Sequence, residues 1–474
     1  MNLIDRDCEG YEEARVGRVF NLRRPSRFPD YVVFPENEEQ VIKAVNLARE
    51  KGLKVTIRSG GHSWAAWSVQ PDSILLDLSR LRILDIDAEK MLVTASTCTT
   101  GVKLNEALSR HGLMFGGGHC PDVAIGGFLL QGGQGWSCRT WGWACEQIES
   151  MRVVMPKGQV VTASRTENAD LFWAARGSGP GFFGVVISFT LRLRKQRRVF
   201  GSTYIFDTEE CYDAVAPWYL DRCDQATEGD LELVMLGLRS EKCMAHLEPS
   251  RPLMIIRAVV FENDPQRAEQ VLTDFFRGIP MKESKHCHLG LDCVETTIAE
   301  EYEQQGRDNP RGLYWTQNSW LDGSNQQVAS ALKTAWTDLP TEKGFALHYS
   351  MGPLRALPKD MCFDIQTNHT FSVYMIAPQD ATDAVKRQCE EYMRRVFDDG
   401  VDRIPAGQGG TAGIYLGDSD LSTRPVRFMS DDNWRRWKDI RDLWDPTRLF
   451  FGYDGEARHG DRWNKNPLEH ADRS

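Results

Sequence analysis

The chain has 474 residues, with 57 lysines and arginines against 67 aspartates and glutamates, which gives a formal net charge of −10. An acidic chain without a long basic run is a poor general nucleic-acid binder, and a content of 41% hydrophobic and 26% charged residues is typical of a globular protein. No stretch reaches the roughly 18 apolar residues that span a membrane, and the first residues, M-N-L-I-D-R-D-C-E, are acidic where a secretory signal would be apolar. We therefore expect an intracellular, cytoplasmic protein of about two to three domains, with no nucleic-acid or membrane partner.

The N-terminal third mixes predicted helices and strands. Asn37 is a good helix N-cap, apolar residues follow it at helical spacing, and Gly52 supplies the stop signal, so a helix is predicted between them. The β-rich run 54–57 leads directly into the glycine loop 58–63. Further predicted elements are strands at 73–77, 83–87 and 91–95, a helix at 101–110, and a hairpin over 151–162 with its turn at 156–158.

The pattern of predicted elements changes after about residue 195. Amphipathic stretches predict helices at 208–227, 264–277 and 325–337, and strand-like runs such as 253–261 and 371–377 lie between them. This pattern predicts a separate α+β domain with an antiparallel sheet. Turn-rich sequence returns at 405–410, and a last predicted helix over 432–443 ends before Pro446.

Twelve cysteines occur without a C-x-x-C pair, so we expect mostly free thiols. The tightest metal-like spacing is His286-Cys287-His288 with Cys293, which could present two histidines on one face of a strand. Because no second ligand pair accompanies it, polar positions on a half-exposed strand are the favoured interpretation, and we predict no metal site.

Glycines are concentrated in three segments. Of the 40 glycines, residues 58–63 hold two, 116–135 hold eight and 177–184 hold four. Backbone N–H groups in such loops form concave anion sites suited to a pyrophosphate. The chain lacks a G-x-x-x-x-G-K-[ST] string, and no G-x-G-x-x-G opens a helix, so a nucleotide-triphosphate site and the ordinary dinucleotide fingerprint have little support. Tight turns explain one glycine pair, but the three groups together predict a large, extended cofactor held by main chain.

Several motifs, in order along the chain, resemble those of one flavoenzyme family. R-S-G-G-H-S at 58–63 resembles the flavin-attachment loop of vanillyl-alcohol-oxidase-type FAD enzymes. H-C-P-D-V-A-I-G-G-F-L-L-Q-G-G-Q-G-W at 119–136 resembles the second attachment motif of their berberine-bridge-enzyme-like branch. Further motifs similar to this branch are R-T-W-G-W-A-C-E-Q-I at 139–148, D-L-F-W-A-A-R-G-S-G at 170–179 and W-D-P-T-R-L-F-F at 444–451. The resemblance covers about 1–195 and 405–453.

The resemblance implies an α+β, two-domain FAD-linked oxidase fold. Residues 1–200, centred on about 27–196, would form a PCMH-type FAD-binding domain together with a C-terminal return at 405–474. Residues 201–404 would form a substrate-binding domain with an antiparallel sheet covered by helices. We expect a monomer or a weak homodimer.

The same resemblance implies covalent FAD held at two points. His62 would bond to the flavin 8α-methyl group (8α-histidyl) and Cys120 to flavin C6 (6-S-cysteinyl), since an imidazole and a thiolate suit an electrophilic flavin. A turn histidine and a buried apolar thiol are the structural alternatives. The expected cofactor-binding residues are Arg58, Ser59, Gly60, Gly61, His62, Ser63, Cys120, Val123, Gly126, Gly127, Gly133, Gly142 and Val186.

The position three residues after the attached cysteine governs oxygen access in the family that the chain resembles. Val123 stands there and is similar to the residue of oxygen-reactive members, so an oxidase is favoured, with a core valine as the alternative. Two positions depart from the family pattern: Phe128 stands where histidine is common, and Gly417 replaces the asparagine of a frequent Y-x-N motif. Tyr415, the first residue of that motif, remains a candidate proton acceptor.

Three more catalytic candidates come from the central region. Gln366, His369 and Tyr374 lie on or near a predicted strand expected to face the flavin, and an unbroken strand would place residues 366 and 374 on one face. Packing within a sheet is the alternative for Tyr374. No carboxylate in this stretch stands out as a base.

The implied reaction is hydride transfer from a substrate C–H bond to flavin N5, removal of the heteroatom proton by a side chain, and reduction of O₂ to H₂O₂. Besides O₂, the substrate would be a small alcohol, sugar or amine. Two alternatives stay open: a dehydrogenase of the same fold that reacts poorly with O₂ and acts on a secondary metabolite, and a non-catalytic flavin-binding protein. His62 and Cys120 argue against the second, because a double attachment has little purpose without redox chemistry.

Overall fold

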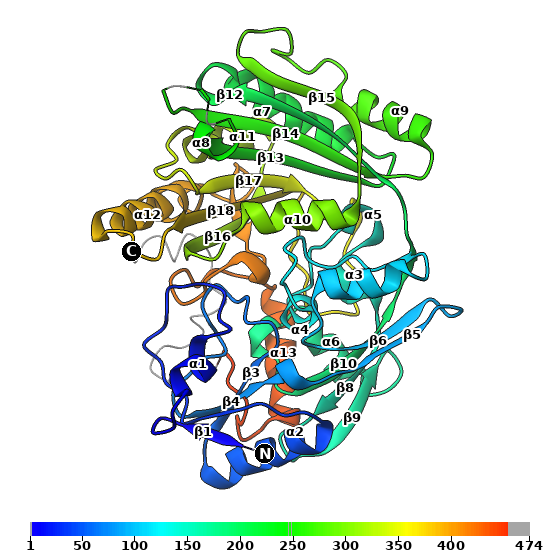
Figure 1. Ribbon diagram of the computed structural model, residues 1–474, viewed down its shortest axis with the longest axis vertical. Coiled ribbons are helices and arrows are strands. Elements are labelled where there is room, and N and C mark those ends of the chain that lie inside the picture. The colour runs from blue at the N-terminus through cyan, green and yellow to red at the C-terminus, as the bar shows by residue number, and fades with distance from the viewer. Residues whose placement is uncertain (1, 245, 248, 454–474) are drawn as a thin grey trace.

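The computed structural model describes residues 2–244, 246–247 and 249–453. Figure 1 shows an eight-stranded sheet with its helices in the upper half of the molecule and a four-stranded and a five-stranded sheet in the lower half. Helix α10 (Ile298–Asp308) lies where the two halves meet, beside α3 (Gly101–Ser109). The predicted α+β fold is confirmed. The final part of the expected return, beyond residue 453, lies outside the described residues.

The lower half contains a four-stranded sheet of order β1-β2-β4-β3 and a five-stranded sheet of order β5-β6-β10-β8-β9. The pairs β2–β4 and β3–β4 are parallel, whereas the five-stranded sheet is antiparallel throughout. The strands are β1 (Leu3–Asp5), β2 (Tyr31–Val33), β3 (Lys54–Arg58), β4 (Ser73–Asp77), β5 (Leu84–Asp87), β6 (Leu92–Ser96), β8 (Ile148–Val154), β9 (Val160–Ser164) and β10 (Val185–Arg192), with a separate pair β7 (Leu113–Met114) and β11 (Arg194–Lys195). The helices are α1 (Tyr11–Val16), α2 (Glu38–Lys51), α3, α4 (Ile125–Leu130), α5 (Cys138–Trp141), α6 (Ala169–Ala175) and α13 (Asp431–Trp444).

Helix α2 begins and ends where its local sequence dictates. The Asn37 side chain accepts a hydrogen bond from the backbone N–H of Gln40 at 3.0 Å, and so satisfies one of the free N–H groups of the first turn. Gly52 ends the helix with φ 67°, a left-handed conformation that glycine adopts without steric cost. The apolar face between these caps, which includes Val41 and Val45, is fully buried against β4.

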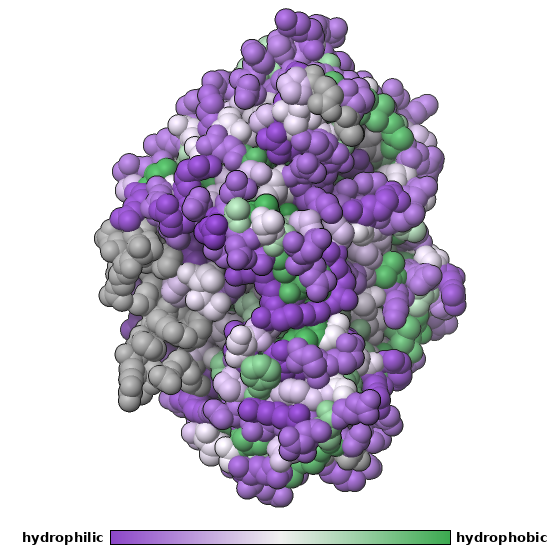
Figure 2. Space-filling model, turned by 60° about the vertical axis from the view of Figure 1, so that its left-hand side comes forward, coloured by the Kyte–Doolittle hydropathy of each residue, from purple (hydrophilic) through white to green (hydrophobic). Residues whose placement is uncertain are grey.

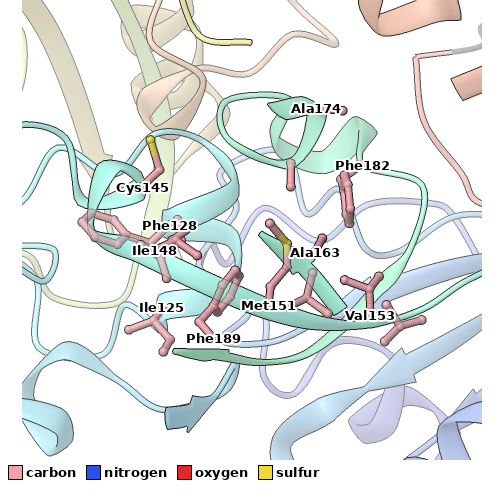
Figure 3. Packing of buried hydrophobic residues seen from close by; sticks show 14 of the residues in the cluster. Ile125, Phe128, Cys145, Ile148, Met151, Val153, Ala163, Ala174, Phe182 and Phe189 are labelled. Carbon is pink, nitrogen blue, oxygen red and sulfur yellow. The ribbon is translucent and has the colours of Figure 1, made fainter. Parts of the chain in front are cut away.

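Residues from both ends of the sequence share the core of the lower half. Val55 on β3 forms backbone hydrogen bonds with Leu449 at 2.8 Å and Phe451 at 2.9 Å. Trp437 of α13 belongs to the same buried cluster as Val55. Figure 3 shows part of this core, in which Met151, Val153, Ala163 and Phe189 come from the five-stranded sheet and Ile125 and Phe128 from α4.

The upper half is built on an antiparallel sheet of order β15-β12-β14-β13-β17-β18-β16-β19. Its strands are β12 (Val199–Asp207), β13 (Leu231–Arg239), β14 (Pro252–Phe261), β15 (Cys287–Thr296), β16 (Leu313–Asp322), β17 (Phe345–Ser350), β18 (His369–Ala377) and β19 (Gly410–Gly413). Helices α7 (Thr208–Gln225), α9 (Pro265–Phe276), α11 (Asn325–Thr337) and α12 (Asp383–Val396) bury one face, and α8 (Ser240–Cys243) and α10 lie toward the other. The other face is therefore available to line a site.

One strand of this sheet lies in the segment expected to return to the lower half. Residues 410–413 form β19, which pairs with β16 at the edge of the eight-stranded sheet. The chain joins the core of the lower half only after this strand, and α13 packs in that core.

None of the described helices is long and apolar enough to cross a membrane. Figure 2 shows one face of the molecule, on which hydrophilic residues predominate. All twelve cysteines are free thiols, as the sequence predicts. His286 and His288 both lie beside Asp207, at 3.0 and 3.1 Å, and Arg251 contacts the same carboxylate. Within the described part of the chain, no cluster of three or more potential ligands is arranged to hold a metal ion.

Candidate active site

A cavity of about 740 Å³ is lined by residues from both halves of the molecule. Its lower wall comes from the loop after β3, the segment from Gly118 to α4, the turn before β10 and residues 450–451. Its upper wall comes from the free face of the eight-stranded sheet and from α10. This volume lies within the range of about 300–1,000 Å³ found for small-molecule and cofactor sites.

Bare backbone forms much of the lower wall. A side chain at Gly60 would bring its Cβ within 2.8 Å of Ala124 Cβ, and one at Gly126 would meet Ser59 Oγ at 2.6 Å, so these glycines allow the two loops to touch. Gly127 is different, because a Cβ there would meet no protein atom within 4 Å and would point into open space. The lower wall is thus a concave surface of main chain, and a side chain at Gly127 would fill part of the space in front of it. This shape fits an extended cofactor held by main chain.

Buried hydrogen bonds of Arg58 hold the loop of the lower wall in place. Its Nε donates to Asp77 Oδ2 at 2.6 Å, and its other nitrogens donate to the backbone carbonyls of Ala14 and Arg15. Arg18 also pairs with Asp77. Burial works to raise the pKa of Asp77, but the two guanidinium groups outweigh it and hold that pKa below its usual value. Arg58 therefore fixes the loop that carries His62.

His62 opens onto the cavity with a defined orientation. Its Nε2 lies 3.1 Å from Asp122 Oδ1, and the Phe20 ring stacks on the imidazole with centroids 4.0 Å apart. Burial works to raise the pKa of Asp122, but the hydrogen bond and charge of His62 lower it overall, so Asp122 is an ionised acceptor at neutral pH. No described residue forms a hydrogen bond with Nδ1, which leaves that nitrogen available as a nucleophile.

Cys120 lines the same cavity on the loop that also carries Asp122. Burial raises the pKa of its thiol above the usual range, and the carboxylates of Asp122 and Asp418 add to the rise. The loop is held in place by its neighbours: His119 Nε2 lies 3.3 Å from Glu232 Oε2 on β13, and Glu232 Oε1 accepts a hydrogen bond from the Ser137 N–H at 2.6 Å. The two expected attachment residues therefore open onto one cavity.

A carboxylate that the sequence interpretation missed faces this cavity as well. Asp418 Oδ2 accepts a hydrogen bond from the Tyr349 hydroxyl at 3.1 Å, and Tyr349 also lies 3.0 Å from Ser372 Oγ. Burial raises the pKa of Asp418, and hydrogen bonds from Tyr349, Tyr374 and Trp64 oppose that rise without cancelling it. A carboxylate with a raised pKa beside a cavity is a candidate general base.

Asp418 lies outside the central stretch around residues 366–374, in which no carboxylate stands out as a base from the sequence. Asp418 directly follows Gly417, the position where the family pattern is broken, and that departure was the available signal. Tyr415, the expected candidate, lines the cavity, but its hydroxyl accepts a hydrogen bond from the Gln134 N–H at 3.1 Å. Burial raises the pKa of the Tyr415 phenol, which keeps it protonated.

Most of the expected site residues line the cavity. They are Arg58, Ser59, Gly60, Gly61, His62, Ser63, Cys120, Val123, Gly126, Gly127, Val186, Tyr374 and Tyr415. Phe128, which stands where the family commonly has histidine, lines it too and packs toward Gly118 and Gly133.

The structure does not bring Gln366 and His369 to the cavity. Gln366 precedes β18, and its amide is occupied by Trp143 Nε1 at 2.7 Å and the Pro353 carbonyl at 2.8 Å. His369 is buried on the opposite face of β18 from Tyr374, with its Nδ1 3.3 Å from His348 Nε2, and burial lowers its pKa. Residues 366 and 374 do not share one unbroken strand, the condition under which both would lie on one face, because β18 begins only at His369.

Gly133 and Gly142 also lie outside the cavity lining. Both have positive φ, at 80° and 88°, and both are needed for close packing. A Cβ at Gly133 would lie 2.8 Å from Ala144 Cβ, and one at Gly142 would lie 2.6 Å from Glu146 Oε1. These glycines shape the backbone beside the site without lining it.

Helix α10 covers one side of the cavity and is attached to both halves. Its Tyr302 is buried against α3, where the Asn105 side chain donates to the hydroxyl at 3.2 Å. Its Glu301 accepts from Arg257 of β14 at 2.6 Å. The cover is therefore part of the packed structure, and its side chains line the cavity.

Comparison with known proteins agrees with this geometry. A family model described as an FAD binding domain matches residues 29–164. The FAD-linked oxidoreductase penO of Penicillium crustosum is 31% identical over 456 residues, which cover 93% of this chain and 94% of that protein. Among solved structures, BBE-like 1 of Physcomitrella patens matches with a TM-score of 0.75 and 18% identity, and covers 95% of each chain. The glucooligosaccharide oxidase of Acremonium strictum, whose FAD is described as 6-S-cysteinyl and 8α-N1-histidyl, matches with a TM-score of 0.77, 19% identity and 95% coverage of each chain.

Proposed function

The chain belongs to the FAD-linked oxidoreductases and has the fold of the berberine-bridge-enzyme-like members, and from this premise we propose that it is an oxidase with FAD attached at both His62 and Cys120. Its reaction is the oxidation of an alcohol, sugar or amine with O₂ as the final electron acceptor. The observation that carries the proposal is that His62 and Cys120, which lie far apart in sequence, open onto the same glycine-lined cavity as the carboxylate of Asp418.

FAD, when bound, supplies a two-electron acceptor for a hydride from a substrate C–H bond, and the electrons then reduce O₂ to H₂O₂. The backbone around Gly60 and Gly127 would hold the cofactor, and His62 and Cys120 would be its two points of attachment. Residues 1–200 with the C-terminal return supply this binding unit, and residues 201–404, which contain most of the eight-stranded sheet, supply the substrate wall.

Asp418 accepts the proton from the substrate O–H or N–H group. Its raised pKa brings it nearer to the operating pH, where a general base is most effective. Tyr349 and Tyr374 hold the carboxylate in one orientation and remain protonated, since burial raises the pKa of both phenols. Val123, a small side chain in the cavity wall beside Cys120, leaves O₂ room to approach.

The attachment is tested on the purified protein by acid precipitation followed by mass spectrometry of flavin peptides. Flavin is expected to remain with the precipitated chain, to remain in each of the single variants His62→Ala and Cys120→Ala, and to be released in the double variant. Cys98→Ala is the matched control, because Cys98 is a half-buried thiol that lies outside the cavity lining. A wild-type protein that releases all its flavin in acid would contradict the double attachment.

The oxidase reaction is tested by reducing the flavin anaerobically and then admitting air. Rapid return of the flavin colour with one H₂O₂ per flavin is expected. Slow recovery would identify a dehydrogenase of the same fold, and a flavin that no substrate reduces would identify a binding protein.

A further inference from the structure

Part of the cavity wall formed by the eight-stranded sheet is aliphatic, beside Thr203 and Arg257 of the same wall. Leu236 on β13 pairs in register with Ile255 on β14 and with Leu347 on β17, and all three line the cavity. Val234 lies two residues before Leu236 on the same face of β13 and lines the cavity too. All four side chains are half-buried, so each presents apolar surface to the cavity. Side chains directly opposite on antiparallel strands lie about 4.5–5.5 Å apart, and the four therefore form one continuous patch.

The patch lies directly beside the candidate base. Val234 pairs with Tyr349, the tyrosine that donates to Asp418, and Leu347 lies two residues before Tyr349 on the same face of β17. A substrate body on the patch would therefore extend away from Asp418 along the sheet.

Most polar groups around the patch already have partners within the protein. Arg257, which pairs with Val234 on its other side, is neutralised by Glu301 at 2.6 Å. On α10, Gln304 donates to Asp308 at 3.0 Å. Lys242 donates to the Lys343 carbonyl at 3.2 Å. Few free donors or acceptors therefore face the patch.

We propose that the substrate is a predominantly apolar alcohol whose hydroxyl lies at Asp418 and whose hydrocarbon body rests on the patch of Val234, Leu236, Ile255 and Leu347. An oligosaccharide carries a hydroxyl on nearly every carbon, and each hydroxyl placed on an aliphatic wall without a partner loses its hydrogen bonds to water. An apolar body gains from the same burial.

This assignment rests on the proposed oxidase function and defines its reaction. The alcohol carbon loses a hydride to FAD and its O–H proton passes to Asp418, which leaves a ketone or an aldehyde. O₂ takes up the two electrons and two protons as H₂O₂.

The test compares decanol and cyclododecanol with glucose and cellobiose on the holoenzyme, with H₂O₂ formation as the first readout. A kcat/KM at least about 100-fold higher for the apolar alcohols is expected. As a second readout independent of turnover, cyclododecanone, which cannot be oxidised at that carbon, should bind and change the flavin absorption spectrum.

Leu236→Asn should raise the KM for decanol at least about tenfold and weaken the binding of cyclododecanone by a similar factor, with flavin attachment unchanged. Val234→Thr, which keeps the shape of the side chain and adds one hydroxyl, should act in the same direction even if Leu236→Asn folds poorly. Leu289→Asn is the control, because Leu289 is a half-buried leucine of the same sheet, on β15, that does not line the cavity.

Faster turnover of cellobiose than of the apolar alcohols, or no spectral response to cyclododecanone, would overturn the substrate assignment. An enzyme that retains its flavin and oxidises only sugars would refute this assignment alone. A protein that retains no flavin would instead refute the proposed function.

Discussion

Replacing Asp122 by asparagine is expected to slow flavin attachment at His62 and leave attachment at Cys120 intact. The Asp122 carboxylate can only accept a hydrogen bond, so at 3.1 Å it requires the proton of the imidazole to be on Nε2. The lone pair of the ring then lies on Nδ1, which is the atom free to bond to the flavin 8α carbon. An asparagine amide can donate to Nε2 instead, which would move the proton to Nδ1 and block the nucleophile.

The expected size of the effect follows from this one contact. A hydrogen bond to a charged group contributes about 1.5–3 kcal/mol, and each 1.36 kcal/mol corresponds to a factor of about ten in rate. The Asp122 side chain is 54% exposed, so solvent screens its charge and the lower end of the range applies. We therefore expect attachment at His62 to be about tenfold slower. The new C–N bond would replace a C–H bond of the flavin methyl group. The proton of that C–H bond and the Nε2 proton, which leaves through Asp122, would combine with the two electrons released and reduce O₂ to H₂O₂.

The assay follows both flavin peptides over time by mass spectrometry after proteolysis. Asp122→Asn should accumulate the Cys120 peptide at the wild-type rate and the His62 peptide slowly. Asp308→Asn is the matched control, since Asp308 is another carboxylate of the cavity wall that does not contact His62. An unchanged rate at His62 would refute the tautomer argument, and equal losses at both positions would point to general damage to the FAD site.

Further predictions concern the candidate base Asp418, the stability of the fold, and the glycine-lined wall of the cavity. Asp418→Asn should slow flavin reduction by substrate about 10²–10⁴-fold, and the rise of activity with pH through the raised pKa of Asp418 should disappear in stopped-flow pH profiles. Arg58→Met leaves the buried Asp77 with Arg18 as its one described cationic partner, and should lower the free energy of unfolding by about 3 kcal/mol in denaturant titrations; a loss below about 1 kcal/mol would contradict the pairing. Burial raises the pKa of Asp230 to about 7, so the unfolded chain releases this proton first and stability falls as the pH rises from about 4 to about 7. Asp230→Asn should therefore be more stable than wild type by on the order of 2–4 kcal/mol near pH 8 and equal to it near pH 4, as thermal unfolding at the two pH values would show. Gly127→Leu should fold normally, because a Cβ there meets nothing within 4 Å, yet should lose bound flavin as measured by absorbance.

Local sequence predicted the elements of the fold well, because their signals are short-range. Asn37 and Gly52 bound α2 as expected, and the predicted hairpin is β8 and β9 with Gly158 at φ 77° in its turn. The order of the eight strands in the upper sheet could not be predicted in this way. It depends on pairings between segments far apart in the chain, such as β13 with β17, for which the sequence contains no local signal.

The same distinction explains which candidate site residues the sequence could indicate. His62 and Cys120 stand within short motifs, so each could be located from its neighbours in sequence. Asp418 gains its chemistry from Trp64, Tyr349 and Tyr374, which come from three distant segments. Its raised pKa is a property of the assembled cavity and of no single stretch of sequence.

The glycine clusters combine two structural functions that the sequence does not distinguish. Gly133 and Gly142 are needed because their own backbone has positive φ and their neighbours pack within 3 Å of where a side chain would begin. Gly127 has neither requirement in the protein itself, since its missing side chain faces open cavity. A ligand that occupies that space would account for the absence of a side chain. A cluster therefore indicates a cofactor through the few glycines that the fold does not need, and replacing Gly127 separates that cause from the demands of packing.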